Sequence, residues 1–373
     1  MQNQNQKQKL DEYQKAGCLF KSCEQYIVVL QKLDDTITNE SREVFDKTRA
    51  KYRGNKFMVL DIINKYEDED EEEGGEATIS CVTSDYSSKF VYRKNEIAEC
   101  EDYNQDNKIV CCSGIHFYLD WTTAFHHNLV RFKMNNFNYT GKYYEWFDDG
   151  RLKFESYYIA GKKNGEEKEW HSTGVLRSHF NYLNDKLCGE AKIFYPSGQL
   201  QKECYYIEGG RLEGASKDFH ENGTLIELKN FKNGALHGIY KVWDKEGKID
   251  YSCDYKDGDK NGKAYSYFLH TQHVYQEFTY KNGLLDGVYR IYNIEGQLVK
   301  EGNFRNSVKH GPYKIWDENG KLIEEGEYID GKEHRNEELA KKIEQEKEEE
   351  KRKMYKEYNK FIKNLINVKI RDD

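Results

Sequence analysis

The stretch GIYKVWDKEGKIDYSCDYKDGDKN, residues 238–261, decides the fold, because close variants of it come before and after it in the chain. When the sequence is cut before each opening glycine, residues 141–334 divide into eight units of 24 or 25 residues. A fixed period of this size is the signature of a repeat architecture. The opening glycines are Gly141, Gly165, Gly189, Gly214, Gly238, Gly262, Gly287 and Gly311.

Each unit predicts a β-hairpin. Seven of the eight units have a second glycine nine residues after the first, which indicates a type I turn with a bulge, since glycine adopts positive φ at little cost. Apolar residues at even separations predict a strand on either side. The sixth unit has Thr271 at the turn position, so we expect a longer, irregular hairpin there. Eight hairpins in a row predict an open antiparallel β-meander.

Aromatic residues occupy two fixed positions in every unit. The first aromatics, five residues after the opening glycine and expected in the repeat core, are Trp146, Trp170, Phe194, Phe219, Trp243, Tyr267, Tyr292 and Trp316. The closing aromatics are Tyr158, Tyr182, Tyr206, Phe231, Tyr255, Tyr280, Phe304 and Tyr328. A single hairpin cannot bury these rings, so the units are predicted to stabilise one another.

The segments NGALHGIYKVWDKEGKI (residues 233–249) and NSVKHGPYKIWDENGKLIEEGEY (residues 306–328) resemble MORN repeats, in particular a variant of that family. The resemblance covers all eight units, about half of the chain. Members of the family mostly act as scaffolds in cytoskeletal, ciliary or membrane-apposed assemblies, so the resemblance implies a role of this kind. A shared fold does not by itself imply a shared activity.

The sequence before the repeats predicts a disordered tail over residues 1–16, a small α+β domain over 17–130 and a linker strand over 131–140. A helix is expected within residues 39–51, and a strand passing into a short helix near Asp120 is expected within residues 111–127. The segments KFMVLDII, SSKFVYRKNEIAE and SGIHFYLDWTTA resemble an uncharacterised module that precedes pentapeptide or MORN-type repeats in proteins of protists and giant DNA viruses. That resemblance implies an architecture and no particular chemistry.

Composition narrows the function classes. The 373 residues carry a net charge of −8, which argues against nucleic acid as a partner, and the start MQNQNQKQK lacks the apolar core of a secretion signal. The nine cysteines are irregularly spaced, as reduced thiols are. We therefore expect a cytoplasmic protein.

The sequence contains no pattern that requires catalysis, a cofactor or a metal. Cys111, Cys112, His116, His126 and His127 fall close together, which suggests zinc, but adjacent cysteines lack the gap that lets two thiolates reach one ion. In a strand the two would also face opposite sides. No phosphate-binding loop, dinucleotide fingerprint or zinc-protease motif is present. No catalytic residue, cofactor-binding residue or metal ligand is therefore assigned.

A column of cations runs through the repeats, three residues after the opening glycine in six units. Strand alternation places it on the same sheet face as the first aromatics, which suggests a track for acidic ligands. The alternative is that these cations pair with glutamates and lie over rings. Residues 141–334 contain 28 Lys and Arg against 32 Asp and Glu, which favours this alternative. The ladder consists of Lys168, Lys192, Lys217, Lys241, Arg290 and Lys314.

Residues 335–373 predict one long charged helix, since no glycine or proline follows Gly331. Its second half has an apolar stripe that needs a partner, either the sheet or another protein. The stripe consists of Tyr355, Tyr358, Phe361, Ile362, Leu365 and Ile366.

The sequence as a whole predicts a mainly β, non-enzymatic scaffold that holds other proteins of a larger assembly, which the resemblance places at the cytoskeleton or a cilium. The first alternative is a membrane-surface adaptor that binds acidic phospholipids through the cation ladder. The second is an enzyme in the N-terminal domain, with the repeats as a targeting arm. The oligomeric state stays open.

Overall fold

The predicted hairpin turn is present in the computed structural model, which describes residues 4–65, 79–85, 87–127 and 139–369. In the third unit, Gly198 N–H donates to Tyr195 O (2.8 Å), and Tyr195 N–H donates to Gln199 O (2.9 Å). Gly198 has φ of +88°, as this turn and its bulge require. In the sixth unit Gln272 takes the positive φ instead, at +61°, in a longer loop closed by a hydrogen bond from Phe268 N–H to His273 O.

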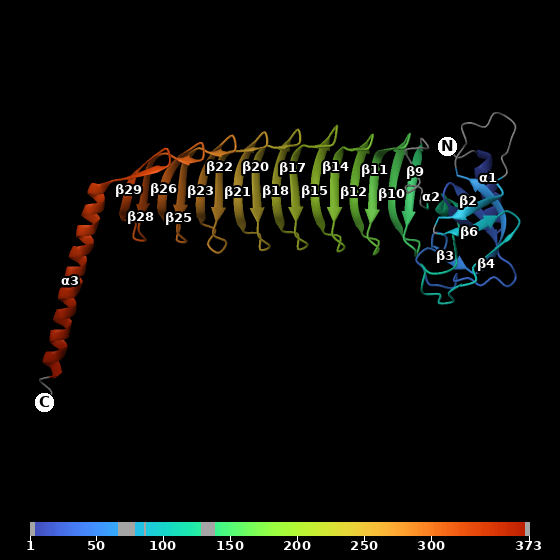
Figure 1. Ribbon diagram of the computed structural model, residues 1–373, viewed down its shortest axis with the longest axis horizontal. Coiled ribbons are helices and arrows are strands. Elements are labelled where there is room, and N and C mark those ends of the chain that lie inside the picture. The colour runs from blue at the N-terminus through green and yellow to red at the C-terminus, as the bar shows by residue number, and fades with distance from the viewer. Residues whose placement is uncertain (1–3, 66–78, 86, 128–138, 370–373) are drawn as a thin grey trace. The chain divides into compact units, whose positions relative to one another are not determined.

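The chain divides into two compact units, Met1–Leu212 and Glu213–Asp373, and each contains a stretch of antiparallel meander whose strands follow one another in chain order (Figure 1). The meander strands of the first unit are β9 (Gly141–Trp146), β10 (Leu152–Ile159), β11 (Lys162–Trp170), β12 (Leu176–Leu183), β13 (Lys186–Leu187), β14 (Gly189–Phe194), β15 (Leu200–Ile207) and β16 (Arg211–Leu212).

The second unit continues the same pattern and ends in a helix. Its strands are β17 (Gly214–Phe219), β18 (Leu225–Lys232), β19 (Ala235–Leu236), β20 (Gly238–Trp243), β21 (Ile249–Lys256), β22 (Asp259–Tyr267), β23 (Val274–Lys281), β24 (Leu284–Leu285), β25 (Gly287–Tyr292), β26 (Leu298–Arg305), β27 (Val308–Lys309), β28 (Gly311–Trp316), β29 (Leu322–Ile329) and β30 (Lys332–Arg335). The predicted terminal helix is α3 (Glu337–Lys369), and Asn336 caps it by accepting from Leu339 N–H (3.1 Å).

The meander has two unlike faces because side chains alternate along each strand. The tyrosine face carries the closing aromatics and the residues two positions after each opening glycine. Large and small side chains oppose each other in several hairpins there: Tyr240 pairs with Cys253, and Tyr289 pairs with Gly302. The ladder face carries the first aromatics and the cations.

The residues before the meander form a small α+β domain, as predicted. Its elements are α1 (Gln4–Lys15), β1 (Leu19–Cys23), β2 (Tyr26–Gln31), β3 (Tyr52–Gly54), β4 (Lys56–Asn64), β5 (Cys81–Ser84), β6 (Ser87–Arg93), β7 (Ile97–Glu99), β8 (Ile115–Phe117) and α2 (Trp121–His126). Strands β1, β2, β4 and β7 make one sheet in that order, and β3–β8 and β5–β6 are two-stranded. Asp120 caps α2 through hydrogen bonds from Thr122 and Thr123 N–H, at the predicted helix start.

Two expectations for this domain need correction. The tail predicted to be disordered over residues 1–16 instead contains α1, because Leu10 is fully buried and Asp11 accepts a hydrogen bond from the Trp121 indole (2.8 Å). The helix expected within residues 39–51 is a loop. Residues 131–138 of the linker strand predicted over 131–140 lie outside the described residues.

Candidate functional site

Three of the six cations of the ladder, Lys168, Lys192 and Arg290, pair with glutamates. Lys168 pairs with Glu166 (2.5 Å) and, across the strands, with Glu155 (3.9 Å). Lys192 pairs with Glu190 (3.0 Å). These pairs reduce the positive charge that the ladder offers to an external anion.

Arg290 shows the same neutralisation in the second unit. It pairs with Glu301 (2.7 Å) and with the buried Glu277 (3.6 Å), which also pairs with Lys263 (2.8 Å). The two cations hold the pKa of the Glu277 carboxyl below its usual value, against the opposing effect of its burial. At Lys241 and Lys314 the described residues show no ion pair, so those two positions keep their charge unpaired.

The first aromatics are half-buried in all eight units. Neighbouring rings on the ladder face contact one another: Tyr144 and Trp146 have centroids 5.7 Å apart, and Tyr265 and Tyr267 are 6.4 Å apart. The more deeply buried rings lie on the tyrosine face, where Tyr143 and Tyr313 are almost fully buried. Part of each ladder-face ring is therefore open to a partner.

Cation–π contacts occur, but at positions that the sequence did not single out. Lys163, Lys260 and Lys309 each lie two residues before an opening glycine. Their ammonium groups are 4.8, 5.1 and 5.0 Å from the ring centroids of closing tyrosines. These lysines cover the edge of the tyrosine face with their stems, as amphipathic side chains do. The sequence signal that could have found these lysines is their constant position, two residues before an opening glycine.

The apolar stripe of α3 is largely exposed to solvent at the positions whose side chains the structure describes. Tyr355, Tyr358 and Phe361 are 70%, 59% and 60% exposed, and Ile362 is half-buried. The side chains of Leu365 and Ile366 lie outside the described residues. The role of this stripe in binding a partner stays a prediction.

The first hairpin turn docks on the loop that replaces the expected helix of residues 39–51. Phe45 and Asp46 N–H both donate to Asp149 O, at 3.0 and 3.1 Å, and the Arg42 guanidinium donates to Asp148 O (2.8 Å). Gly150 is buried there, and a Cβ on it would collide with Asp46 O. The loop's backbone groups bond to the turn, which explains why they do not form a helix.

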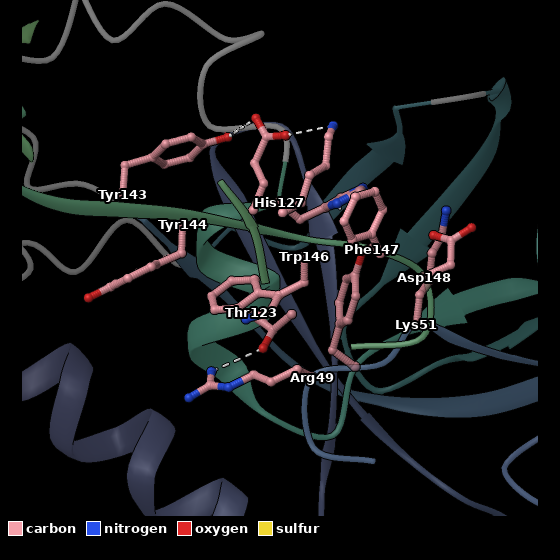
Figure 2. Close-up of a pocket in the computed structure, with 12 residues that line it drawn as sticks. Arg49, Lys51, Thr123, His127, Tyr143, Tyr144, Trp146, Phe147 and Asp148 are labelled. Atoms are coloured by element: carbon pink, nitrogen blue, oxygen red, sulfur yellow. Dashed lines mark hydrogen bonds and ion pairs between the residues drawn. The ribbon is translucent and has the colours of Figure 1, made fainter. Parts of the chain in front are cut away.

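A cavity of about 370 Å³ lies between this first hairpin and the N-terminal domain (Figure 2). Arg49 reaches under the Trp146 ring, with its guanidinium 5.0 Å from the centroid. The same guanidinium donates to Thr123 Oγ1 (3.1 Å) and pairs with Asp120 (3.1 Å). Lys153, at the rim, pairs with Glu145 (3.0 Å). The charges of Arg49 and Lys153 are thus already paired within the chain.

Buried histidines of the domain are held neutral, and one of them, His127, lines this cavity. Burial lowers the pKa of His126 to about 3 and that of His116 to about 4, and it lowers the pKa of His127 well below its usual range. The His126 ring packs against Tyr144 and Trp146, with centroids 5.4 and 6.0 Å away. His127 Nδ1 bonds to the Tyr118 hydroxyl (2.9 Å). His126 thus forms part of the packing between the domain and the first hairpin.

The cysteine and histidine cluster considered for zinc is not brought together as a metal site. Cys111 bonds weakly to Asp148 (3.6 Å) and accepts from Lys51 (3.8 Å), whereas His116 Nε2 bonds to Val110 O (2.8 Å). Within the described ranges, no group of three or more His, Cys, Asp or Glu is arranged to hold a metal ion. Sequence reasoning missed the cavity because its lining comes from segments about a hundred residues apart.

Comparison with known proteins defines the class of the chain. Residues 163–184, 187–208, 212–233, 236–257 and 309–330 match the MORN repeat variant, and residues 9–124 match a family of unknown function, DUF5758. The chain is therefore a repeat protein. More specifically, it contains repeats that match the MORN repeat variant and an N-terminal segment that matches DUF5758.

Other comparisons add little. Among curated proteins, none matches the chain. The crystal structure of TarM is 12% identical over 33% of this chain and 20% of its own, with a TM-score of 0.16. A structure of TcdB2-TccC3-Cdc42 is 9% identical over 82% of this chain and 18% of its own, with a TM-score of 0.12. The chain thus spans about a fifth of the length of either structure.

In the described part of the chain, no helix has the length and apolar character needed to cross a bilayer.

Proposed function

We propose that the protein is a non-enzymatic scaffold whose sheet binds other proteins of a larger assembly. MORN repeats suggest a protein-interaction or membrane-binding module. The properties of the ladder face distinguish between these two functions. Its rings are half-buried, and apolar side chains such as Tyr157 and Tyr205 are 38% and 47% exposed beside them. Within the described residues, α2 contacts β9 and α3 contacts β29, and no helix makes an extended contact with the strands between.

This surface suits a protein partner better than a lipid headgroup. Half-buried aromatic rings give large contact area at a low cost in side-chain entropy, which is why they dominate protein interfaces. The ladder cations Lys168, Lys192 and Arg290 are paired with glutamates, so their field toward an anionic surface is weak. The membrane-adaptor alternative through the ladder is therefore the less favoured one.

The location we propose is the cytoplasm, at a cytoskeletal or ciliary assembly, which follows from the family resemblance. The N-terminal domain has a structural part in this proposal, since it docks against the first hairpin through Arg42, Phe45 and Asp46. Imaging of the tagged full chain in its source cell tests the location. A diffuse signal, or one confined to another compartment, would contradict it.

The experiment that tests the scaffold function compares three forms of the full chain. The ladder-face variant carries Tyr157→Ser and Tyr205→Ser. The matched control carries Leu269→Ser and Ile294→Ser, which remove two equally exposed apolar side chains from hairpin turns. Wild type and control should retain a defined set of proteins in quantitative co-purification, and the ladder-face variant should lose them. Equal retention by all three forms would overturn the proposal.

A further inference from the structure

The helix α3 changes character in the middle. Residues 337–350 contain seven glutamates and three lysines, a net charge of −4, whereas residues 351–362 contain five lysines and arginines and one glutamate, a net charge of +4. The first half also lies near the sheet, where Glu346 pairs with Lys321 (2.7 Å) and Leu339 is half-buried. The second half is basic, and the side chains of residues 351–361 are all exposed.

Charge and apolar surface are separated around the second half. At 3.6 residues per turn, Met354, Tyr358 and Phe361 follow one another at intervals of four and three and share one side of the helix. Lys353, Lys356 and Lys360 follow at intervals of three and four on the opposite side. This separation is the pattern of helices that lie in a membrane interface.

The exposed side chains are of the kinds that a membrane interface accepts. Met354 is 67% exposed and Tyr355 is 70% exposed, and both residues are on or beside the apolar side. Tyrosine places its ring at the boundary of the hydrocarbon and its hydroxyl in the headgroups. Lysine stems extend so that their ammonium groups stay among lipid phosphates.

We infer that the second half of α3, from Lys351 to Ile362, is an amphipathic element that binds an anionic membrane surface. It would lie in the plane of the interface, with Met354, Tyr358 and Phe361 in the acyl boundary and the lysines among acidic headgroups. This inference goes beyond the scaffold function, because it gives the scaffold a place of attachment that does not depend on the ladder.

A second copy of the chain fits this surface less well. In a parallel pair of helices, two basic segments of +4 would face each other. In an antiparallel pair, the apolar side would meet the first half of the partner helix, which offers only Leu339, Ala340 and Ile343. Leu339 and Ile343 are already half-buried in their own chain. An anionic surface complements the charge and accepts the whole apolar side.

The test is co-flotation of the full chain with vesicles of phosphatidylcholine alone, or with about a third phosphatidylserine. The basic variant carries Lys353→Gln, Lys356→Gln and Lys360→Gln, and the apolar variant carries Tyr358→Ser and Phe361→Ser. The matched control removes three charges from the first half of the same helix, by Lys341→Gln, Lys342→Gln and Lys347→Gln. All eight substituted positions are exposed, so the variants should fold like the wild type, which circular dichroism checks.

We expect wild type and control to bind the anionic vesicles and not the neutral ones, with weaker binding at high salt. The basic and apolar variants should each bind at least about tenfold more weakly. Equal binding by all forms, or equal loss in the control, would overturn the inference. A second result would also overturn it. If no form binds vesicles, and sedimentation shows a dimer that the apolar variant abolishes, the apolar side binds a second copy of the chain. Vesicle binding can fail while the scaffold test succeeds, so the two proposals are judged separately.

Discussion

Tyr289 lies across the sheet from Gly302, so close that a Cβ on Gly302 would be 2.6 Å from the Tyr289 ring. The ring is buried and packs against Phe304, with centroids 5.0 Å apart. On the tyrosine face the large Tyr289 ring thus fits because the residue opposite it has no side chain. Tyr313 and Gly326 repeat the relationship one unit later.

Gly302→Ala should destabilise the compact unit Glu213–Asp373 by about 1 to 3 kcal/mol. The added methyl group would overpack a site that is already filled. Gly302 does not have a positive φ, so backbone strain does not contribute to this cost. The measurement is chemical denaturation. In a Tyr289→Ala background the same substitution should cost much less, and an unchanged cost in that double-mutant cycle would show that the Tyr289 ring is not the cause.

Gly150→Asn should cost about 1 to 3 kcal/mol more than Gly174→Asn. Both glycines hold the same turn position, with φ of +89° and +88°, and asparagine tolerates this region better than other residues. Gly174 has open space around it, whereas a side chain on Gly150 would collide with Asp46 O and come within 3.0 Å of Ala50 N. Thermal melts of the two variants provide the comparison, and equal losses would mean that the first turn is not docked on the N-terminal domain.

The buried histidines should make the protein less stable in mild acid. The folded-state pKa of His126, about 3, lies below the ordinary value, so its contribution is present above about pH 6.5 and is lost as pH falls toward the folded pKa. Between pH 7 and pH 5 the unfolded state gains about 2 kcal/mol from protonation of one such histidine.

His126→Phe should remove that share of the pH dependence, since phenylalanine keeps the ring contacts and has no group to protonate. It also removes Nδ1, which is buried without a hydrogen-bond partner in the described structure. The free energy of unfolding is to be measured at both pH values, with the exposed His270→Gln as control. A slope as steep as in wild type would rule His126 out as its source.

Removing charge from the ladder should change little. Lys168→Gln, Lys192→Gln and Arg290→Gln break ion pairs that are mostly partly exposed, each worth about 0 to 1 kcal/mol. The buried Glu277, which Arg290→Gln affects, keeps Lys263 as its partner. Melting and vesicle flotation of the triple variant are the measurements. A sharp drop in vesicle binding would restore the ladder as a lipid site and contradict the preference for protein partners.

The repeats could be predicted closely because their signals are local. The turn glycines report a positive φ that few other residues adopt, and the seven in this position all have it, from Gly150 to Gly320. The departure at Thr271 was predicted for the same reason. Local turn chemistry and strand alternation suffice when each unit contacts its neighbours in sequence.

The N-terminal parts were harder, because their conformation depends on distant partners. α1 has few apolar residues and is held by Leu10 and by the Asp11 contact with Trp121, more than a hundred residues later. The loop around Asp46 contains good helix formers, yet its backbone bonds to Asp149 of the first hairpin. No pattern within either segment records these partners.

Three of the joints between hairpins share one hydrogen bond. Asn181 donates from its side-chain amide to Glu190 O (3.1 Å), Asn230 donates to Ile239 O (2.6 Å), and Asn303 donates to Pro312 O (3.1 Å). Each bond spans nine residues and crosses from one hairpin to the next over an opening glycine. Since these three joints are alike, a gene encoding such a chain can gain or lose the units between them by unequal recombination and still encode matching ends. The number of repeats is therefore free to vary in descent, while the two terminal elements stay as they are.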